Sequence, residues 1–517
     1  MKTKLFMLVL ALVLSVGMVL SLAACNTTDA PEKEAETPAT NENNGGNEDD
    51  VNPDFVEDTE AGLYAAGSNF TVQVKTWAEL VEGGHITVDG AEVVTSDGTL
   101  EGELLVSRNV TRIDNGAFGF NPKLVAVKIP GTVTEIRNSA FYKCDELVSV
   151  ELCEGVRVIE EEAFGWCQKL ESITLPASLE SITGAFNGST ALVSIEVAEG
   201  NKTFKSVDGD LYSIDGKVLY QYAIGKAETD VTIPDGVVTI ADYAFRSAAN
   251  ITTVTLPDSV ESIGYYSFNY TLALKNINFG NGLVEIGEFA FAECGASEIT
   301  LPDSVEKIGG YAFCCCGNLV KITLSKNLLQ LGEAVFVESR NLESIEIDPE
   351  SAVFKSMDGD LYSADLLTLV QYALGKNATV IEIPYYVTSI GDYAFASCNN
   401  FVKVVLHENV ESVGDFAFLN CDGLNEIIIP EGVKSLGEGA LGDNDSLVVF
   451  TLPSTIEYLG ENVFMWNTAL RYVFYNGDFE MWEAIEKGSE WFDGTYVLYE
   501  VHCNDGTVIY TEPPVEY

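Results

Sequence analysis

A period of about 23 residues runs through most of the chain and limits it to folds that grow by stacking. Phe, usually preceded by Ala, returns at steps of 22 or 23 residues, apart from two steps of 59. Such a period is typical of a solenoid, in which one unit cannot bury its apolar face and must stack on its neighbours. Each long step fits one unit that carries an insert of about 36 residues. The repeated position is occupied by Phe118, Phe141, Phe164, Phe186, Phe245, Phe268, Phe291, Phe313, Phe336, Phe395, Phe418, Leu441 and Phe464.

Within a unit, apolar residues follow the Phe at fixed distances. Ser172–Leu175 alternates polar and apolar residues, which is the period of a half-buried strand. Pro176 follows, and because Pro has no N–H for a β-ladder, it should end the strand. Leu179 and Ile182 then line a second wall. We therefore predict a mainly β solenoid, capped at both ends, with one short parallel strand per 23-residue turn, a short second wall and helical or 3-10 turns.

The repeated pattern LxxIxLPxxVxxIGxxAFxxC resembles the 23-residue leucine-rich repeat of BspA-like bacterial surface proteins, over roughly residues 100–475. The resemblance implies a leucine-rich-repeat solenoid on an extracellular protein, often an adhesin. It implies no particular ligand, because leucine-rich repeats are scaffolds on which many binding functions are placed.

The N-terminus predicts where the protein is located. Lys2 and Lys4 precede an apolar run from Leu5 to Leu22, which closes on Ala-Ala-Cys25. This resembles a bacterial lipoprotein signal, which implies cleavage after residue 24, lipid attachment to the Cys25 thiol and a lipid-anchored place on the bacterial cell surface. The alternative is an uncleaved membrane anchor, since 18 residues can just span a bilayer.

The rest of the chain divides by composition and period. Residues 25–60 are acidic and nearly free of apolar residues before Val51, which predicts a disordered linker. Residues 61–110 are expected to form an N-terminal cap with strands at 70–74 and 86–88 and a helical turn at 77–81. The remaining expected segments are the repeat solenoid at 111–475, with inserts near 198–230 and 348–380, and an aromatic C-terminal cap at 476–517.

The charge balance excludes one class of partner. Lys and Arg total 28 against 79 Asp and Glu, a formal net charge of -51. This field repels phosphate backbones, so we expect no nucleic-acid partner, while cationic surfaces or peptides would be attracted. The alternative is that the acidic groups serve only the solubility of an extended solenoid.

The two inserts are near copies, 150 residues apart. Asp215-Gly216 in the first copy predicts a hairpin turn, whereas the second copy has Asp365-Leu366, so we expect its turn to be built differently. Asp208, Asp210 and Asp215 could surround a calcium ion, but their spacing is not that of an EF-hand loop, and turn formation is favoured.

Cysteine and histidine give little evidence of chemistry. Six of the eleven Cys stand three residues after the Phe, where other units have Asn, Ser or Thr. This position suits a small side chain that hydrogen-bonds the backbone of the turn. The short distance between adjacent turns would also allow a disulfide between their cysteines. We predict no metal site, because Cys314-Cys315-Cys316 has no zinc spacing and no second cluster to complete it, and no cofactor. We predict no catalytic residues, because the three His lie in separate turns. The six cysteines are Cys144, Cys167, Cys294, Cys316, Cys398 and Cys421.

These observations favour a surface-displayed, adhesin-like binding protein that contacts an extracellular protein, mucin, matrix or another cell surface along its strands. Many similar weak contacts on a repeated polar surface would suit such a role. The alternatives are a structural envelope spacer without a ligand, and a glycan-binding protein that uses Trp466, Trp482 and Trp491 as an aromatic platform instead of as cap residues. The candidate binding residues on the strand face are Thr253, Thr255, Asn276, Asn278, Lys321, Thr323, Ser344 and Glu346.

Overall fold

The structure is a computed structural model that describes residues 58–68, 70–488, 491 and 500–510. The chain divides into Met1–Phe55 and Val56–Tyr517, and the description below concerns the second unit. The predictions for the signal sequence, for Cys25 and for the linker up to residue 57 lie outside the described residues.

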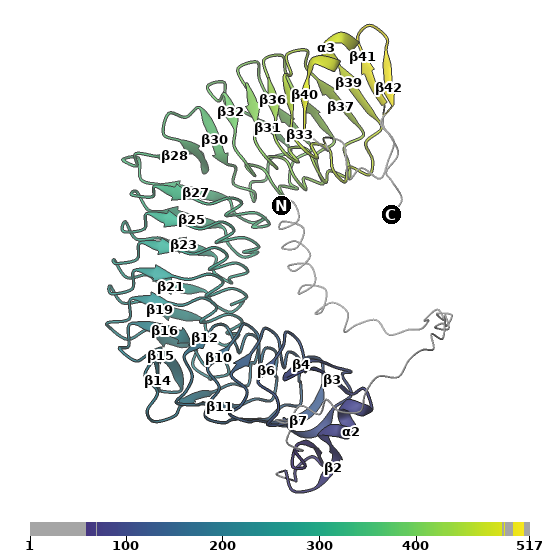
Figure 1. Ribbon diagram of the computed structural model, residues 1–517. Helices are drawn as coiled ribbons and strands as arrows, with labels where there is room; N and C mark the ends of the chain where they lie inside the picture. Colours follow the sequence, from purple (N-terminus) through teal and green to yellow (C-terminus); the bar gives the residue numbers. More distant parts are fainter. Residues whose placement is uncertain (1–57, 69, 489–490, 492–499, 511–517) are drawn as a thin grey trace, which may run out of the picture. The chain divides into compact units, whose positions relative to one another are not determined.

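The described chain is a β solenoid, as the 23-residue period predicts (Figure 1). One strand per turn builds the first wall, and within each of its sheets neighbouring strands pair in parallel from one turn to the next; Val254 lies opposite Ile277, for example. Pro follows many of these strands directly, as expected. The strands of the first wall are β5 (Glu101–Leu105), β7 (Lys123–Ile129), β9 (Ser149–Leu152), β11 (Ser172–Leu175), β13 (Ser194–Val197), β17 (Asp230–Thr232), β19 (Thr253–Thr255), β21 (Asn276–Asn278), β23 (Glu298–Thr300), β25 (Lys321–Leu324), β27 (Ser344–Ile347), β31 (Val380–Glu382), β33 (Lys403–Val405), β35 (Glu426–Ile428), β37 (Val449–Leu452), β39 (Tyr472–Tyr475) and β41 (Glu500–Cys503).

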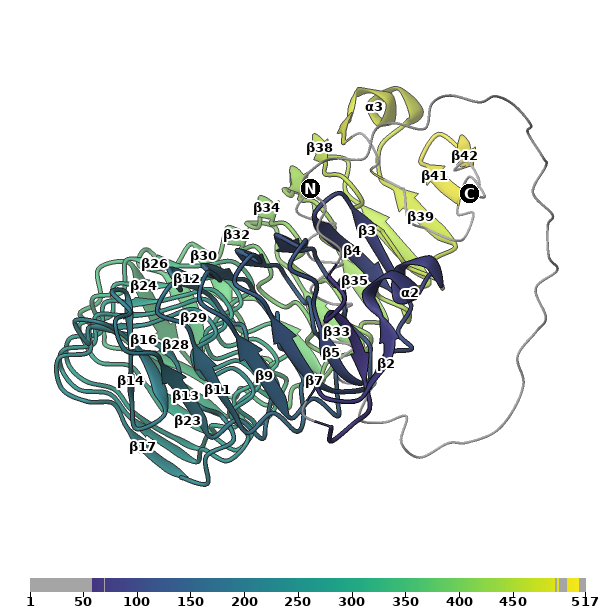
Figure 2. The same ribbon diagram turned by 60° about the horizontal axis from the view of Figure 1, so that its bottom comes forward.

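A second wall of shorter strands faces the first across the core (Figure 2). Its inward residues, such as Ile263 and Ile286, are almost fully buried and lie opposite each other in neighbouring turns. Apart from the two helices described below, the described strands are joined by hydrogen-bonded turns. The strands of this wall are β4 (Glu92–Ser96), β6 (Arg112–Ile113), β8 (Glu135–Ile136), β10 (Val158–Ile159), β12 (Ser181–Ile182), β18 (Thr239–Ile240), β20 (Ser262–Ile263), β22 (Glu285–Ile286), β24 (Lys307–Ile308), β26 (Gln330–Leu331), β32 (Ser389–Ile390), β34 (Ser412–Val413), β36 (Ser435–Leu436), β38 (Tyr458–Leu459) and β40 (Glu486–Lys487).

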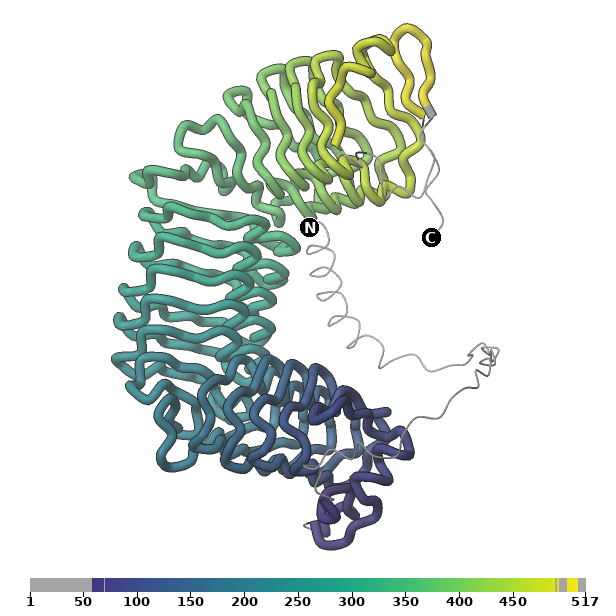
Figure 3. The backbone as a smooth tube through the Cα atoms, in the orientation of Figure 1, coloured from purple at the N-terminus to yellow at the C-terminus, as the bar shows by residue number. Residues whose placement is uncertain are grey.

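The Ala-Phe turns close each coil and bind directly to the next turn (Figure 3). The Phe141 N–H donates to the Ala163 carbonyl at 2.7 Å, and this contact returns in most of the described turns. The Phe rings are fully buried and stack on one another, with centroids 5.1 Å apart between Phe268 and Phe291 and 5.5 Å apart between Phe291 and Phe313. The aromatic period of the sequence therefore forms internal stacks of rings, which run from Phe118 to Phe186, from Phe245 to Phe336 and from Phe395 to Phe418.

The position three residues after the Phe forms a second internal ladder. The Cys167 thiol donates to the Phe141 carbonyl of the preceding turn, and the Ser339 hydroxyl donates to the Phe313 carbonyl at 2.7 Å. Cys, Ser and Asn all occur at this position because each has a small side chain with a hydrogen-bond donor. The donor is needed because a buried carbonyl without a partner is costly. The prediction that these cysteines serve as hydrogen-bonding residues is confirmed.

The inserts divide the core into three clusters of buried side chains, covering residues 61–211, 212–361 and 362–503. In the first insert, the turn at Gly209 accepts a hydrogen bond from the Ile195 N–H and so covers the free edge of β13. Tyr222 then takes the place of a Phe, with its ring stacked 5.0 Å from Phe245, and Tyr372 does the same for Phe395. The insert strands are β14 (Phe204–Val207), β15 (Asp210–Ser213), β16 (Val218–Gln221), β28 (Phe354–Met357), β29 (Asp360–Ser363) and β30 (Thr368–Gln371).

The turn of the second insert corrects one expectation. Leu366 adopts φ 65°, close to the 78° of Gly216, and Asp365 accepts from the Ser363 hydroxyl at 2.6 Å, as Asp215 does from Ser213. The prediction that this turn is built differently is wrong, because the Ser–Asp hydrogen bonds hold the same backbone path despite the side chain in a left-handed conformation.

Both ends of the described array carry extra elements. At the start, β1 (Gly62–Tyr64), β2 (Gln73–Thr76), α2 (Trp77–Glu82) and β3 (Ile86–Asp89) extend the two walls. The strand expected at 70–74 begins only at Gln73, because Phe70 has a positive φ of 61°. At the other end, α3 (Phe479–Ala484) and β42 (Val508–Tyr510) flank β41.

Replacement of Phe291 by Ala tests the internal stack. Phe291 is fully buried between two other rings, so its truncation should lower the free energy of unfolding by about 3 to 5 kcal/mol. Urea denaturation would measure the loss, and limited proteolysis should cut first near residues 280–320.

Phe120 supplies the matched control because its ring is 63% exposed. Phe120→Ala should leave the urea midpoint nearly unchanged. Equal effects of the two substitutions would mean that Phe291 does not belong to the core.

Candidate binding surfaces

The predicted binding residues lie on four strands of the first wall in the middle cluster. On β19 and β21, the Asn276 amide donates to the Thr253 hydroxyl at 3.4 Å, and the Asn278 amide donates to the Thr255 hydroxyl at 3.0 Å. All four side chains are exposed or half-exposed. The outward face of these strands is therefore a row of small polar groups that already bind each other.

The other four residues lie on β25 and β27 in the neighbouring sheet. The Lys321 ammonium pairs with Glu346 at 2.8 Å, and the Ser344 hydroxyl donates to the same carboxylate at 3.5 Å. Thr323 lies opposite Glu346 in the register of the two strands. The eight residues thus share one wall but fall on two separate three-stranded sheets, β17-β19-β21 and β23-β25-β27.

The seven-stranded sheet that starts at β31 has a different outward face, which the sequence analysis missed. In one row of partners, Ile428 of β35 is followed by Thr451, Phe474 and His502 on successive strands. The exposed fractions are 50% for Ile428 and 43% for both Phe474 and Tyr472. Ile428, Tyr472 and Phe474 lie 8 or 10 residues after their repeat Phe, the same offsets as Thr253 and Thr255, so the repeat register locates this apolar and aromatic row in the sequence.

The tryptophans named for a sugar platform do not share one exposed surface. Trp482 of α3 is 3% exposed and packs edge-on against Tyr475 at 5.4 Å. Trp491 packs against Trp482 at 5.6 Å and is partly buried against the same core. Trp482 therefore fills the last turns of the core, and this position fits a cap residue.

The acidic residues of the inserts have structural partners. Asp210 is buried, accepts from the Ala223 N–H and pairs with Lys226 at 2.7 Å; burial raises the pKa of its carboxyl. Asp360 and Lys376 repeat the pair at 2.6 Å. Among the described residues, no cluster of His, Cys, Asp and Glu has the arrangement of a metal site.

The buried cysteine thiols of the internal ladder are poor nucleophiles. The ten cysteines of the described region are free, so no disulfide joins adjacent turns there. Burial raises the pKa of the Cys144 thiol to about 12 and that of Cys294 to about 11, which keeps both thiols protonated and weakly nucleophilic at neutral pH.

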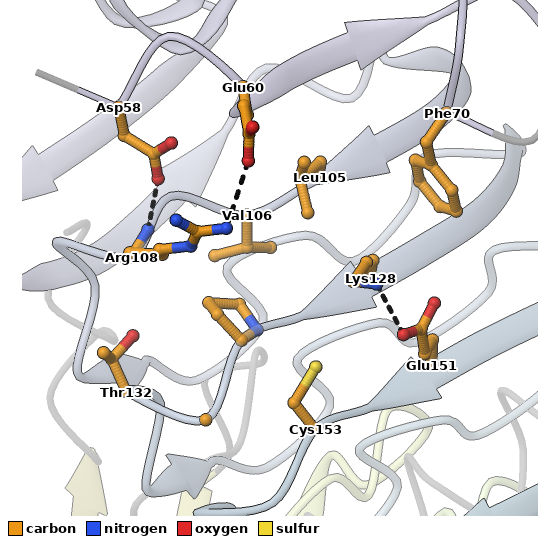
Figure 4. Close-up of a pocket in the computed structure, with 12 residues that line it drawn as sticks. Asp58, Glu60, Phe70, Leu105, Val106, Arg108, Lys128, Thr132, Glu151 and Cys153 are labelled. Carbon is orange, nitrogen blue, oxygen red and sulfur yellow. Dashed lines mark hydrogen bonds and ion pairs between the residues drawn. The ribbon is translucent and has the colours of Figure 1, made fainter.

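A cavity of about 590 Å³ lies beside the first turns (Figure 4). Its cations already have partners: the Arg108 guanidinium pairs with Glu60 at 3.1 Å, and Lys128 pairs with Glu151 at 2.6 Å. Cys153, which replaces the usual Pro, lines the floor, and burial raises the pKa of its thiol. The cavity therefore offers neither a free cation nor an activated nucleophile.

The three histidines remain apart, as the sequence indicates. His85 contacts Asp97 at 2.8 Å near the start, His407 contacts the Pro384 carbonyl, and His502 contacts Glu500 at 2.9 Å in β41. Each is bound within its own region, and no Ser or Cys nucleophile is among their recorded partners in the described residues.

The chain belongs to the BspA-type leucine-rich-repeat family. The family's repeat region matches in six copies over residues 102–207, 229–357 and 372–484, which together make up more than half of the sequence. The gaps between these segments contain β15 and β16 of the first insert and β29 and β30 of the second. The family and fold predicted from the repeat are therefore confirmed.

Several solved bacterial structures are similar to the chain. A leucine-rich repeat protein from Eubacterium ventriosum is 24% identical, with 53% of this chain and 77% of that chain covered and a TM-score of 0.47. The pneumococcal vaccine antigen PcpA is 21% identical (81% and 86% covered, TM-score 0.38), and a leucine rich cell surface protein from Faecalibacterium prausnitzii is 22% identical (78% and 97% covered, TM-score 0.33). No curated protein matches. At this level of similarity, the structures assign no function to the chain.

None of the helices in the described part of the chain has the length and apolar character needed to cross a bilayer.

Asp443 gives the C-terminal turns a pH dependence. Burial, with Asp422, Asp445 and Glu338 nearby, raises the pKa of the Asp443 carboxyl to about 6. The folded state therefore holds a proton that the unfolded state releases near pH 4, so this group's contribution to stability falls as pH rises from about 4 through 6. Asp443→Asn should stabilise the protein at pH 7 by on the order of 1 kcal/mol, and the gain should vanish near pH 4.

Melting curves of the wild type and the variant between pH 4 and 7.5 would show this difference. Asp235→Asn, at an exposed turn, removes the same charge elsewhere and serves as the control. A gain that is equal for both variants, or independent of pH, would contradict the assignment to Asp443.

Proposed function

We propose that the protein is an adhesin-like binding protein that presents the first wall of its solenoid to an extracellular protein, mucin, matrix or another cell surface. The observation that carries this proposal is the exposed apolar and aromatic row of the sheet that starts at β31. Exposed apolar groups on neighbouring strands are costly in water and mark interaction surfaces.

Two parts of the wall contribute differently. Ile428, Tyr472 and Phe474 supply the apolar contact area that usually dominates binding energy. The polar rows at Thr253, Thr255, Asn276, Asn278, Lys321, Thr323, Ser344 and Glu346 extend the surface with many weak contacts. The net charge of -51 favours contact with cationic patches of these partners.

Display at the cell surface is part of the proposal. A lipid on Cys25 would hold the chain at the membrane, and an acidic linker up to residue 60 would keep the repeats away from the lipid headgroups. Such a tether places many copies side by side, so weak contacts add up to firm adhesion.

Binding of the purified full-length chain to immobilised mucin, matrix proteins and whole cells tests the proposal. Joint replacement of Ile428, Tyr472 and Phe474 by Thr should weaken binding at least about tenfold, because each truncation removes exposed apolar contact area. The melting temperature should change little, since all three side chains point outward.

A second variant carries Ala at Thr253, Thr255, Asn276, Asn278, Lys321 and Thr323. It should reduce binding to a smaller degree, and Leu329→Ala, at an exposed side chain elsewhere, should have no effect. No binding of the wild type to any of these surfaces would favour a structural spacer. Binding that survives both wall variants but responds to changes at Trp466 or Trp491 would favour the glycan-binding alternative.

A further inference from the structure

One turn of the solenoid departs from the pattern of all the others. After the strand β31 and Pro384, the next two positions are Tyr385 and Tyr386, with exposed fractions of 63% and 41%. Other units have Gly, Ala, Pro or polar residues in these positions, and the copy 150 residues earlier has Asp235-Gly236. Two large aromatic side chains held in water have no role in the repeat itself, because turns without them adopt the same architecture.

The two tyrosines border a shallow cavity of about 460 Å³. The Tyr385 ring lies over His407 with centroids 4.8 Å apart, and its hydroxyl donates to Glu408 at 3.3 Å. The Tyr386 ring meets the edge of Tyr362 at 6.2 Å. The rings therefore have defined positions, yet large parts of both remain in contact with solvent. Thr388, Asn409, Glu411, Gly432 and Lys434 complete the lining.

The carboxylates around the cavity differ in their partners. Glu411 pairs with Lys434 at 2.8 Å, whereas no ion pair to a described Lys or Arg is recorded for Glu408. An exposed carboxylate beside two partly exposed tyrosine rings attracts a cation through its charge, and the ring quadrupoles add to this attraction.

The chain itself shows how this combination binds a cation. Lys226 lies 5.0 Å from the Tyr222 ring centroid while it pairs with Asp210, and Lys376 repeats the arrangement with Tyr372 and Asp360. In each case a tyrosine face and a carboxylate hold one basic side chain. Tyr385, Tyr386 and Glu408 provide the same two kinds of group at the surface.

We propose that Tyr385, Tyr386 and Glu408 form a binding site for a lysine or arginine side chain of a partner protein. The proposal rests on the proposed binding function in that the partner is a protein, but the site can be tested without knowing that partner. The net charge of -51 brings cations to the surface, and the aromatic pair then selects where they bind. A neutral sugar, which also stacks on tyrosine rings, is the competing occupant.

Zero-length carbodiimide coupling of an acetyl-Gly-Lys-Gly-amide peptide to the full-length chain would test the site, with mass spectrometry to locate the amides formed. Coupling at Glu408 should exceed coupling at Asp258, its counterpart in the first copy, by about three- to tenfold, as expected for a cation held by aromatic faces. N-acetylarginine amide in excess should reduce coupling at Glu408 selectively.

The matched variant carries Tyr385→Asp and Tyr386→Gly, which restores the residues of the first copy and adds a negative charge. Coupling at Glu408 should fall to the level of Asp258, and Tyr385→Ala alone should give part of this loss. Equal coupling at both carboxylates in the wild type, or unchanged coupling in the variant, would show that only the general acidic field acts and would overturn the proposal.

Inhibition by N-acetylglucosamine oligosaccharides but not by N-acetylarginine amide would assign the cavity to a sugar and would also overturn it. Selective coupling at Glu408 by a chain that binds no cell, mucin or matrix surface would leave the site intact while the proposed adhesive function fails. Surface binding without selective coupling at Glu408 would support the adhesive function and overturn the cation site.

Discussion

The direct contact between successive Ala-Phe turns is the interaction on which the rest of the structure depends. A backbone hydrogen bond, such as that from Phe141 to Ala163, fixes the spacing of two turns, and the stacked rings exclude water from the core between them. The ladder of Cys, Ser and Asn satisfies the carbonyls that this packing buries, as Ser339 does for Phe313. Because most turns repeat the same internal contacts, stability depends little on the outward side chains, and these are free to vary with function.

The two inserts show how the array tolerates an interruption. Each insert covers one strand edge, supplies a tyrosine in place of the missing Phe and starts a new core cluster. Side chains also connect turns on either side of an insert: Arg246 pairs with Glu162 at 3.2 Å, and Glu338 accepts from Ser397 at 2.8 Å and from Asn420 at 2.9 Å. These pairs add polar contacts where the Phe stack is interrupted.

Much of this fold could be predicted from the sequence because the period, the alternation along each strand and the Pro at the strand end are local signals. The Phe stack and the thiol ladder followed from the same register. The turn at Leu366 could not, because a Leu in a left-handed conformation depends on the hydrogen bonds of Ser363 and Asp365. Arg246 contacts Glu162, 84 residues away in the sequence. This contact depends on how turns meet across an insert, and no local sequence pattern indicates it.

The candidate sites were less predictable than the scaffold. The polar residues of β19 to β27 follow from the repeat because they are outward and repetitive, whereas the last sheet and the turn at Tyr385 carry large exposed apolar and aromatic side chains at outward positions. The apolar row of the last sheet and the tyrosine pair after Pro384 both differ from the repeat. A consensus pattern contains only the residues that the units share, so it does not include such differences.

Hydrogen exchange resolved to single residues or short peptides, measured on the full-length chain, tests the central claim most directly. If successive turns are joined through their Ala-Phe segments, the amides of Phe141, Phe268 and Phe418 should exchange orders of magnitude more slowly than those of the exposed turns that follow the strands of the first wall. Exchange of these Phe amides at the rate of an unstructured peptide, while the strands stay protected, would contradict the account.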